Sequence, residues 1–176
     1  MSRSGYSTDC DGWELIMYRG QVQSALRGMR GLNFLRELKE ALEALPEKKL
    51  CDYDLQRVDG SCCAIGAVGK LRGINMVGQD PEAMTESGAL AGMFDIAQQM
   101  VREIEYENDD DEWAPSWHGD TSLPKKNGKF VDAHGITKEE YQAKQDEARW
   151  HRMYNWTQAQ IKKTEAFRLK RGWSIN

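Results

Sequence analysis

The sequence predicts a mainly α-helical protein, with residues 1–176 forming a single-domain bundle of four to five amphipathic helices. Three observations support this prediction. Apolar residues recur at three- and four-residue steps through most of the chain, which is the period of one helix face. A length of 176 residues suits one domain and hardly two. Hydrophobic residues make up 40% of the chain, which is enough for a core without disulfide support.

The first predicted helix starts at Gly12, where a three- and four-residue apolar period begins. It ends at Gly28 and Gly31, because glycine commonly terminates helices. A second helix is predicted from an N-cap at Asn33 to a stop at Pro46. The short link between the two helices favours an antiparallel or strongly angled pair.

The middle of the chain is predicted to hold a small extended or hairpin piece near residues 50–61, because an Asp-Gly turn signal follows apolar residues there. A short helix is predicted from about Cys62 to Arg72. Its Gly66 and Gly69 each weaken a helix by up to ~1 kcal/mol relative to alanine. We therefore expect this helix to pack closely against a neighbouring helix.

A longer helix is predicted from roughly Ser87 to Glu107. Before it, Asp80 is a suitable N-cap and Pro81 a suitable first-turn residue for a short lead-in helix. Residues 108–136 combine an acidic run with an irregular insertion, so they predict a long loop. Loops of this length are usually functional or disordered.

The last predicted element is a C-terminal helix over residues 137–170. Thr137 and Glu140 have the T-x-x-E spacing of a capping box, in which each residue binds the backbone of the other. At the opposite end of the chain, residues 1–11 are small and polar, and we expect a flexible N-terminus.

The sequence indicates a reducing, membrane-free environment. No stretch approaches 18 consecutive apolar residues, and the N-terminus lacks the apolar run of a signal peptide. The four cysteines include the adjacent pair Cys62 and Cys63 but no CxxC motif, which is typical of free thiols in a reducing cytoplasm. We therefore predict a cytoplasmic protein with no membrane partner.

Charge is distributed unevenly along the chain. The formal net charge of −4 disfavours a general nucleic-acid coat protein. Residues 1–112 carry 12 basic and 21 acidic side chains, whereas residues 113–176 carry 12 and 7. A nucleic-acid-binding module is therefore one alternative function, although cations that suit the dipole of a solvated helix are the favoured interpretation. Its candidate residues are Lys162, Lys163, Arg168, Lys170 and Arg171.

The main enzymatic alternative is a hydrolase with a thiol nucleophile. Cys63 or Cys62 lies at a predicted helix N-terminus, where the helix dipole favours thiolate. His118, His134 or His151 would serve as the base. A buried structural thiol is favoured over this reading, because the surrounding segment is apolar. Adjacent cysteines suit zinc poorly and the glycines match no phosphate-loop motif, so we predict no metal and no cofactor.

The acidic run and the loop after it form the predicted partner-binding region. Residues 105–112 carry six acidic side chains in eight positions, a density that can imitate the phosphates of DNA. A solvated loop is the ordinary alternative. Aromatic residues beside such charges are frequent binding anchors. The candidate residues are Asp109, Asp110, Asp111, Glu112, Trp113, Trp117 and His118.

Two motifs carry a resemblance to a known family. They are C-A-x-G-A-V-G-x-x-R-G-I-x-M at Cys63–Met76 and E-I-x-Y-E-N-D within Val101–Asp109. The chain resembles small proteins encoded by tailed bacteriophages and prophages, over most of its length except about residues 113–136. The resemblance implies an accessory protein in the bacterial host cell that binds a host or defence protein. The leading hypothesis is thus protein–protein interaction, including inhibition of a host-defence or nuclease component.

Overall fold

The computed structural model describes residues 12–109 and 117–176, and it confirms the mainly α prediction. These residues form seven helices and no strand. The helices are α1 (Gly12–Arg27), α2 (Met29–Ala44), α3 (Ala64–Leu71), α4 (Pro81–Glu86), α5 (Ala89–Phe94), α6 (Gln98–Asp109) and α7 (Lys138–Lys170). In the part of the chain described, no helix is both long and apolar enough to cross a bilayer.

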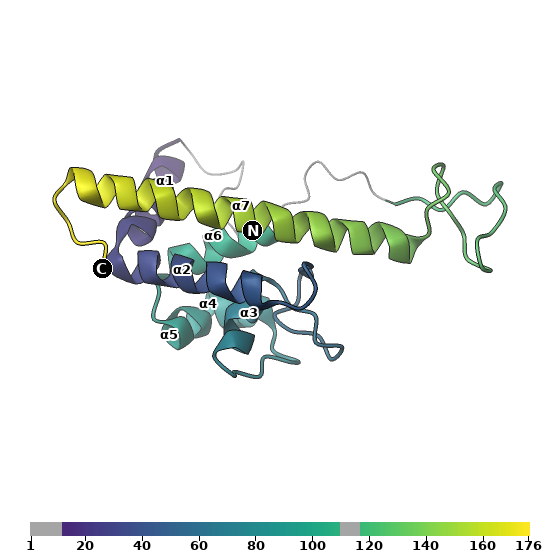
Figure 1. The fold of residues 1–176 in the computed structure, drawn as a ribbon, viewed down its shortest axis with the longest axis horizontal. Coiled ribbons are helices and arrows are strands. Elements are labelled where there is room, and N and C mark those ends of the chain that lie inside the picture. The colour runs from purple at the N-terminus through teal and green to yellow at the C-terminus, as the bar shows by residue number, and fades with distance from the viewer. Residues whose placement is uncertain (1–11, 110–116) are drawn as a thin grey trace.

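Helix α7 is the longest element, and α1, α2 and α6 pack against it (Figure 1). Its 33 residues correspond to about 50 Å at 1.5 Å per residue. Helix α2 lies beside α7 with the opposite chain direction, and α3 packs against α2. Helix α6 contacts α1, α3 and α7, so it joins both ends of the chain to the middle. The capping box predicted for Thr137 and Glu140 is present at the start of α7.

The apolar faces of these helices enclose one hydrophobic core. Phe34 of α2 meets Phe94 of α5 edge to face, with ring centroids 5.8 Å apart. Trp150 and Met153 enter the core from α7, and the Trp150 indole N–H donates to the Leu42 carbonyl at 3.1 Å. The buried indole therefore has the hydrogen-bond partner that such a ring needs.

Helix α2 begins earlier than the sequence predicts. The N-cap prediction at Asn33 is wrong, because α2 starts at Met29 and Asn33 lies inside it. Only Gly28 separates α2 from α1. A Cβ atom at Gly31 would overlap the carbonyl oxygen of Ala25 in α1, so glycine is required where the two helices meet.

The single helix predicted for residues 87–107 is interrupted, and it forms α5 and α6 instead. The interruption is at Asp95, which adopts a left-handed conformation with φ of 53° and ends α5. The predicted lead-in helix is confirmed as α4, where the Asp80 carboxylate accepts hydrogen bonds from two first-turn N–H groups. The described chain thus has more and shorter helices than the four to five predicted.

The extended piece predicted near residues 50–61 forms a tight turn and not a strand pair. The Arg57 N–H donates to the Ser61 carbonyl at 2.8 Å, and Gly60 of the Asp-Gly pair has φ of 87°. Isolated β-bridges connect Gln56 to Cys62 and to Val77, and the described residues form no continuous ladder. The Asp-Gly signal therefore predicts the turn correctly, and the predicted hairpin is reduced to a single antiparallel bridge between Gln56 and Cys62.

The glycines of α3 make the close approaches that the sequence predicts, but to a different kind of neighbour. A Cβ atom at Gly66 would overlap the carbonyl oxygen of Leu55, and one at Gly69 would lie 2.5 Å from the sulfur of Met76. Both neighbours lie in the loops on either side of α3 and not in another helix. These loops are thus pressed onto the helix at its two glycines.

Candidate functional site

The first turns of α7 and the segment before them extend beyond the helical body (Figure 1). Residues 138–148 of α7 are exposed or half-exposed, and Arg149 is the first buried residue of the helix. We refer to residues 117–137, which precede the helix, as the tip. The tip contains part of the predicted partner-binding region, so its construction and its attachment to the body decide what it can do.

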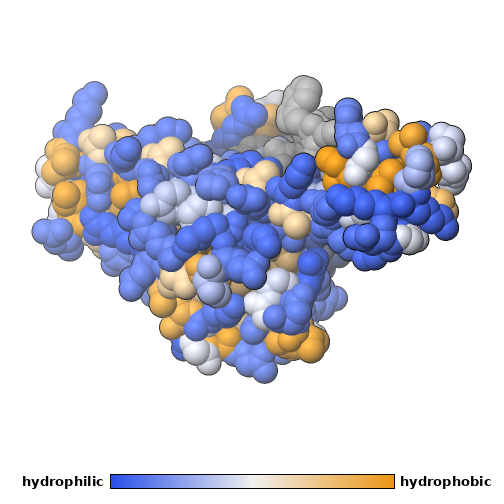
Figure 2. All heavy atoms as spheres, turned by 45° about the vertical axis from the view of Figure 1, so that its right-hand side comes forward, coloured by the Kyte–Doolittle hydropathy of each residue, from blue (hydrophilic) through white to orange (hydrophobic). Residues whose placement is uncertain are grey.

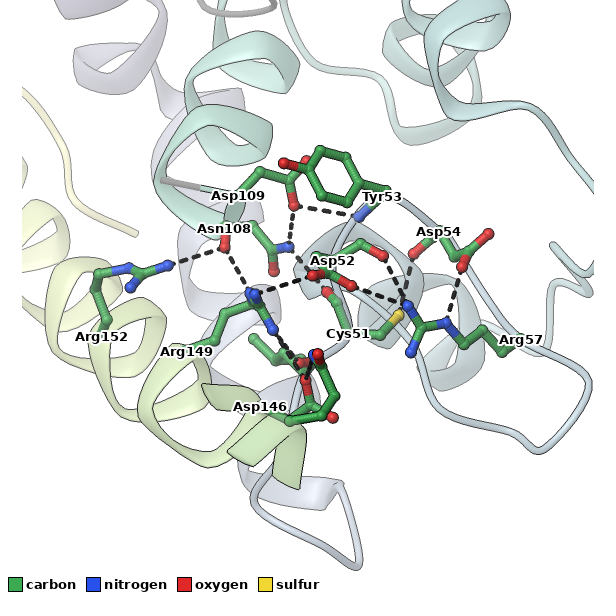
Figure 3. Close-up of polar contacts among 12 residues, drawn as sticks. Cys51, Asp52, Tyr53, Asp54, Arg57, Asn108, Asp109, Asp146, Arg149 and Arg152 are labelled. Carbon is green, nitrogen blue, oxygen red and sulfur yellow. Dashed lines mark hydrogen bonds and ion pairs between the residues drawn. The ribbon is translucent and has the colours of Figure 1, made fainter. Parts of the chain in front are cut away.

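Arg149 attaches α7 to the body at the point where its exposed turns end (Figure 3). Its side chain is 0% exposed. The guanidinium donates to the carbonyls of Asn108 at 2.9 Å and Leu50 at 3.0 Å. It also donates to the carboxylates of Asp146 at 3.0 Å and Asp52 at 3.4 Å. A buried charge needs such partners to offset its loss of hydration.

The same cluster terminates α6. The last carbonyls of a helix lack partners within it and carry partial negative charge. Arg152 of α7 donates to the carbonyls of Glu107 at 3.1 Å and Asn108 at 3.0 Å, beside the bond from Arg149. Two cations from α7 therefore bind the C-terminal end of α6, and α6 and α7 are fixed to each other.

Asp109, one of the predicted partner-binding residues, is engaged within the chain. Its carboxylate accepts from the side-chain amide of Asn108 at 2.8 Å and from the N–H of Tyr53 at 3.4 Å. Asn108 itself is buried, and it also donates to the Cys51 carbonyl and accepts from the Ala64 N–H, each at 3.0 Å. Asp109 thus belongs to the structural cluster of Figure 3.

The tip has its own internal support. The Trp117 indole N–H donates to the Ile136 carbonyl at 3.0 Å, so the two ends of the tip are tied together. A Cβ atom at Gly119 would lie 2.7 Å from the Trp117 ring and 3.3 Å from Phe130. The indole therefore lies directly on the backbone of Gly119, close to Phe130.

A two-residue turn forms the far part of the tip. Lys126 and Lys129 exchange two backbone hydrogen bonds of 3.0 Å around Asn127 and Gly128, whose φ values are 50° and 78°. An Asn-Gly pair in this conformation is a strong hairpin signal. The predicted irregular insertion therefore contains a hairpin turn, and the Asn-Gly dipeptide is the sequence signal for it.

Ion pairs join the tip to the first turn of α7. Lys126 binds Glu140 at 2.6 Å, and Lys129 binds Glu139 at 2.7 Å. Glu140 also accepts from the N–H of Thr137 at 3.0 Å as part of the capping box. The hydrogen bond from Lys126, followed by that from Thr137, lowers the pKa of Glu140 to about 2. The tip is thereby connected to the helix that carries it.

The surface of the tip combines an exposed aromatic ring with polar side chains. Phe130 is 44% exposed, and the Lys125 ammonium lies 4.3 Å from its ring centroid. His118 is exposed and Trp117 is half-buried. Figure 2 shows hydrophobic residues among hydrophilic ones at this end of the molecule. The other predicted partner-binding residues, Asp110, Asp111, Glu112 and Trp113, lie outside the described residues.

The residues of the thiol-nucleophile alternative are not brought together. Cys62 and Cys63 are buried, and the Cys63 sulfur accepts from the Gly66 N–H at 3.4 Å as the N-cap of α3. Burial raises the pKa of both thiols above 9.0, which disfavours the reactive thiolate. His118 and His134 belong to the tip, which lies well away from α3 in Figure 1.

Beside Asn108 and Asp109, the cluster of Figure 3 has no room for a substrate, whereas its Cys51, Arg57 and Asp146 also line a separate cavity of about 420 Å³. The cavity beside Asn108 and Asp109 has a volume of about 10 Å³, which is space for a single water at most. Over residues 12–109 and 117–176, no three His, Cys, Asp or Glu side chains are grouped as metal ligands would be. The hydrogen bonds of the cluster position α6, α7 and the loop around Asp52.

At the other end of α7, the predicted nucleic-acid-binding residues divide into two groups. Arg168 is buried, and its guanidinium donates to the carbonyls of Ser174 at 2.6 Å and Arg27 at 2.9 Å. It therefore fixes the C-terminal residues and α1 to α7. The exposed members of the set are Lys162, Lys163, Lys170 and Arg171.

Comparison of the chain with protein families, with curated proteins and with solved structures finds no match. The resemblance to bacteriophage proteins, and the host or defence partner that it implies, therefore stay predictions. The functional inference depends on the geometry of the two ends of α7.

Proposed function

We propose that this protein acts by binding another protein, and that the tip is part of the contact surface. The observation that supports the proposal is the exposure of Phe130 on a segment that is internally bonded and projects from the helical body. Because the tip is already held in shape by Trp117 and by its ion pairs to α7, little conformational entropy is lost when a partner covers it.

The chemistry of the tip favours a protein partner over a small ligand. Phe130 is a large apolar side chain beside Lys125, and His118 adds a polar group on the same segment. Aromatic residues surrounded by polar ones are typical of the few positions that dominate the affinity of protein interfaces. The acidic residues 110–112 lie five to seven positions before the tip in sequence. The resemblance to bacteriophage proteins extends the proposal to a bacterial defence or nuclease component as that partner.

The test uses two variants that place the same charge on an exposed apolar residue. Phe130→Asp changes the tip, whereas Val58→Asp changes the turn at residues 57–61, where Val58 is 91% exposed. A photoreactive residue at His118 first identifies the partner in bacterial lysate, and purified partner then gives a dissociation constant. We expect Phe130→Asp to raise that constant at least about 30-fold, the equivalent of a 2 kcal/mol hot spot. We expect Val58→Asp to leave it unchanged.

Two results would contradict the proposal. One is a partner that crosslinks at His118 but binds the Phe130→Asp variant as tightly as the parent protein. The other is an equal loss of affinity in both variants, which would point to a general effect of added charge. Neither residue belongs to the hydrophobic core, so we expect both variants to keep the helical body. Circular dichroism of the two variants checks this.

A further inference from the structure

The C-terminal end of the molecule carries an excess of cations over anions. Residues 162–176 contain five basic residues and one acidic residue, in a chain whose net charge is −4. The acidic residue is Glu165, and Arg36 of α2 binds it at 2.7 Å. Among the described residues, no ion pair involves the four exposed cations of this segment, which are Lys162, Lys163, Lys170 and Arg171.

Ordinary helix electrostatics explains only part of this pattern. Cations are favoured in the last turn of a helix, which accounts for Lys170, but the effect is confined to that turn. Lys162 and Lys163 lie two turns earlier. On a solvated helix face, lysines are commonly matched by acids three or four positions away. Lys163 and Lys170 have no acid at that spacing, and Lys162 has only Glu165, which is already bound.

Aromatic rings lie among these cations. Phe167 and Trp173 meet edge to face, with centroids 5.9 Å apart. The Arg171 guanidinium lies 4.8 Å from the Phe167 centroid and 5.7 Å from that of Trp173. Phe167 stands between Lys163 and Lys170 at helical spacings of four and three, so the three share one face of α7. Trp173 remains 47% exposed.

The tail that carries Trp173 is fixed in place. The Arg168 guanidinium donates to the Ser174 carbonyl at 2.6 Å, and Arg36 donates to the Ile175 carbonyl at 2.7 Å. The backbone N–H of Trp173 also donates to the Arg168 carbonyl at 2.9 Å. The indole is therefore presented on an ordered chain, beside the Arg171 guanidinium.

We propose that Lys162, Lys163, Lys170, Arg171 and Trp173, here termed the C-terminal surface, bind single-stranded nucleic acid. The four cations would contact phosphates, and a base would stack on the exposed indole. We propose a single strand and not a duplex, because the bases of a single strand are available for stacking on aromatic rings. The proposal is independent of the tip, which lies at the other end of α7 (Figure 1).

The binding test measures the fluorescence anisotropy of a labelled twenty-nucleotide oligothymidylate. With four phosphate contacts, the slope of log affinity against log salt is expected near −3, because each contact on a single strand contributes about −0.7. Affinity should thus fall roughly 50-fold between about 50 and 200 mM salt. Absence of binding at about 50 mM salt would overturn the proposal.

Matched charge variants locate the binding surface. Lys162→Gln, Lys163→Gln, Lys170→Gln and Arg171→Gln in one chain should abolish binding at the higher salt concentration. The control chain carries the same charge change at Lys125, Lys129, Lys138 and Lys144, which are also exposed and lie toward the tip. The control should bind as the parent does. Equal losses in the two chains would mean that binding follows net charge alone, and the proposal would fail.

Trp173→Ala separates a nucleic-acid surface from a general anion patch. Loss of base stacking should weaken oligothymidylate binding roughly tenfold. The same variant should leave binding of heparin, a polyanion without bases, unchanged. If Trp173→Ala has no effect and heparin competes as well as the oligonucleotide, the surface recognises anions of any kind, and the nucleic-acid assignment is wrong. Far-UV circular dichroism checks that the variant keeps its helix content.

Discussion

Replacing Arg149 by methionine should destabilise the protein more than any other single change at an ionisable residue of α7. Methionine keeps most of the side-chain length but has no donor. The carbonyl of Leu50 and the carboxylates of Asp52 and Asp146 then each lose a charge-assisted bond. The Asn108 carbonyl is affected less, because Arg152 still donates to it at 3.0 Å.

The size of the stability loss follows from the groups that lose their bond to Arg149. A buried carbonyl without a partner costs about 1–3 kcal/mol, and Leu50 is a buried residue. The side chains of Asp52 and Asp146 are only 20% and 18% exposed, so water replaces the lost bonds incompletely, although Arg57 still binds Asp52 and the Gln142 amide still donates to Asp146. Breaking a buried charge cluster by removing one member typically costs about 3–5 kcal/mol. We expect that loss of unfolding free energy for Arg149→Met, or roughly 6–20 °C in Tm.

The assay is urea denaturation followed by far-UV circular dichroism, with Arg152→Met as the matched control. Arg152 is half-buried and lies one turn further along α7, and the Asn108 carbonyl to which it donates keeps its bond from Arg149. We expect the control to lose about 1 kcal/mol, the net value of an ordinary hydrogen bond. If Arg149→Met costs no more than this control, the buried guanidinium contributes little to stability and the cluster has another role.

Three further predictions concern other features of the fold. Gly66→Ala should lower the unfolding free energy by about 1–3 kcal/mol, because the added Cβ atom would overlap a loop carbonyl. Gly92→Ala should raise it by about 0.4–1 kcal/mol, because no atom lies within 4 Å of the added Cβ. Chemical denaturation of the two variants measures both changes. Burial raises the pKa of Cys51 from 9.0 to about 12, so its iodoacetamide labelling, mapped by mass spectrometry, should be far slower in the native than in the urea-unfolded protein. The raised value also adds stability that is complete below pH 9.0 and is lost as pH rises toward 12. Because the pKa of Glu140 is lowered from 4.5 to about 2, its stabilisation of the tip is present above pH 4.5 and should be lost as pH falls toward 2, which NMR titration of the Thr137 amide would detect.

The helices could be predicted from the sequence wherever a local signal sets their ends. The capping box at Thr137, Asp80 before α4 and Gly28 after α1 all act through backbone groups within a few residues. The break at Asp95 has no such signal, because the period of apolar residues continues through it. An aspartate can adopt the left-handed conformation at modest cost, and it does so here because tertiary packing favours two short helices over one long one.

The candidate surfaces could be predicted only in part, for a physical reason. Arg149 lies within a helix of mixed charge, and its burial depends on carbonyls 41 and 99 positions away in sequence. No local pattern distinguishes it from Arg152 or Lys144. The same holds for Arg168, which the sequence suggests is a solvated cation but which holds the tail instead. Burial of a charge is set by the final packing, and composition alone cannot reveal it.

The arrangement of α7 makes the two proposed surfaces separable by experiment. About 36 Å of helix separates Lys138, next to the tip, from Lys162, and Arg149 fixes the intervening part of α7 to the body. A change at Phe130 should therefore leave oligonucleotide affinity unchanged, and neutralising Lys162 and its neighbours should leave protein binding unchanged. Effects of mutations more than 7–10 Å apart are usually additive. Coupling between the two surfaces would require α7 to move against α6, and the two arginines at the end of α6 oppose that movement.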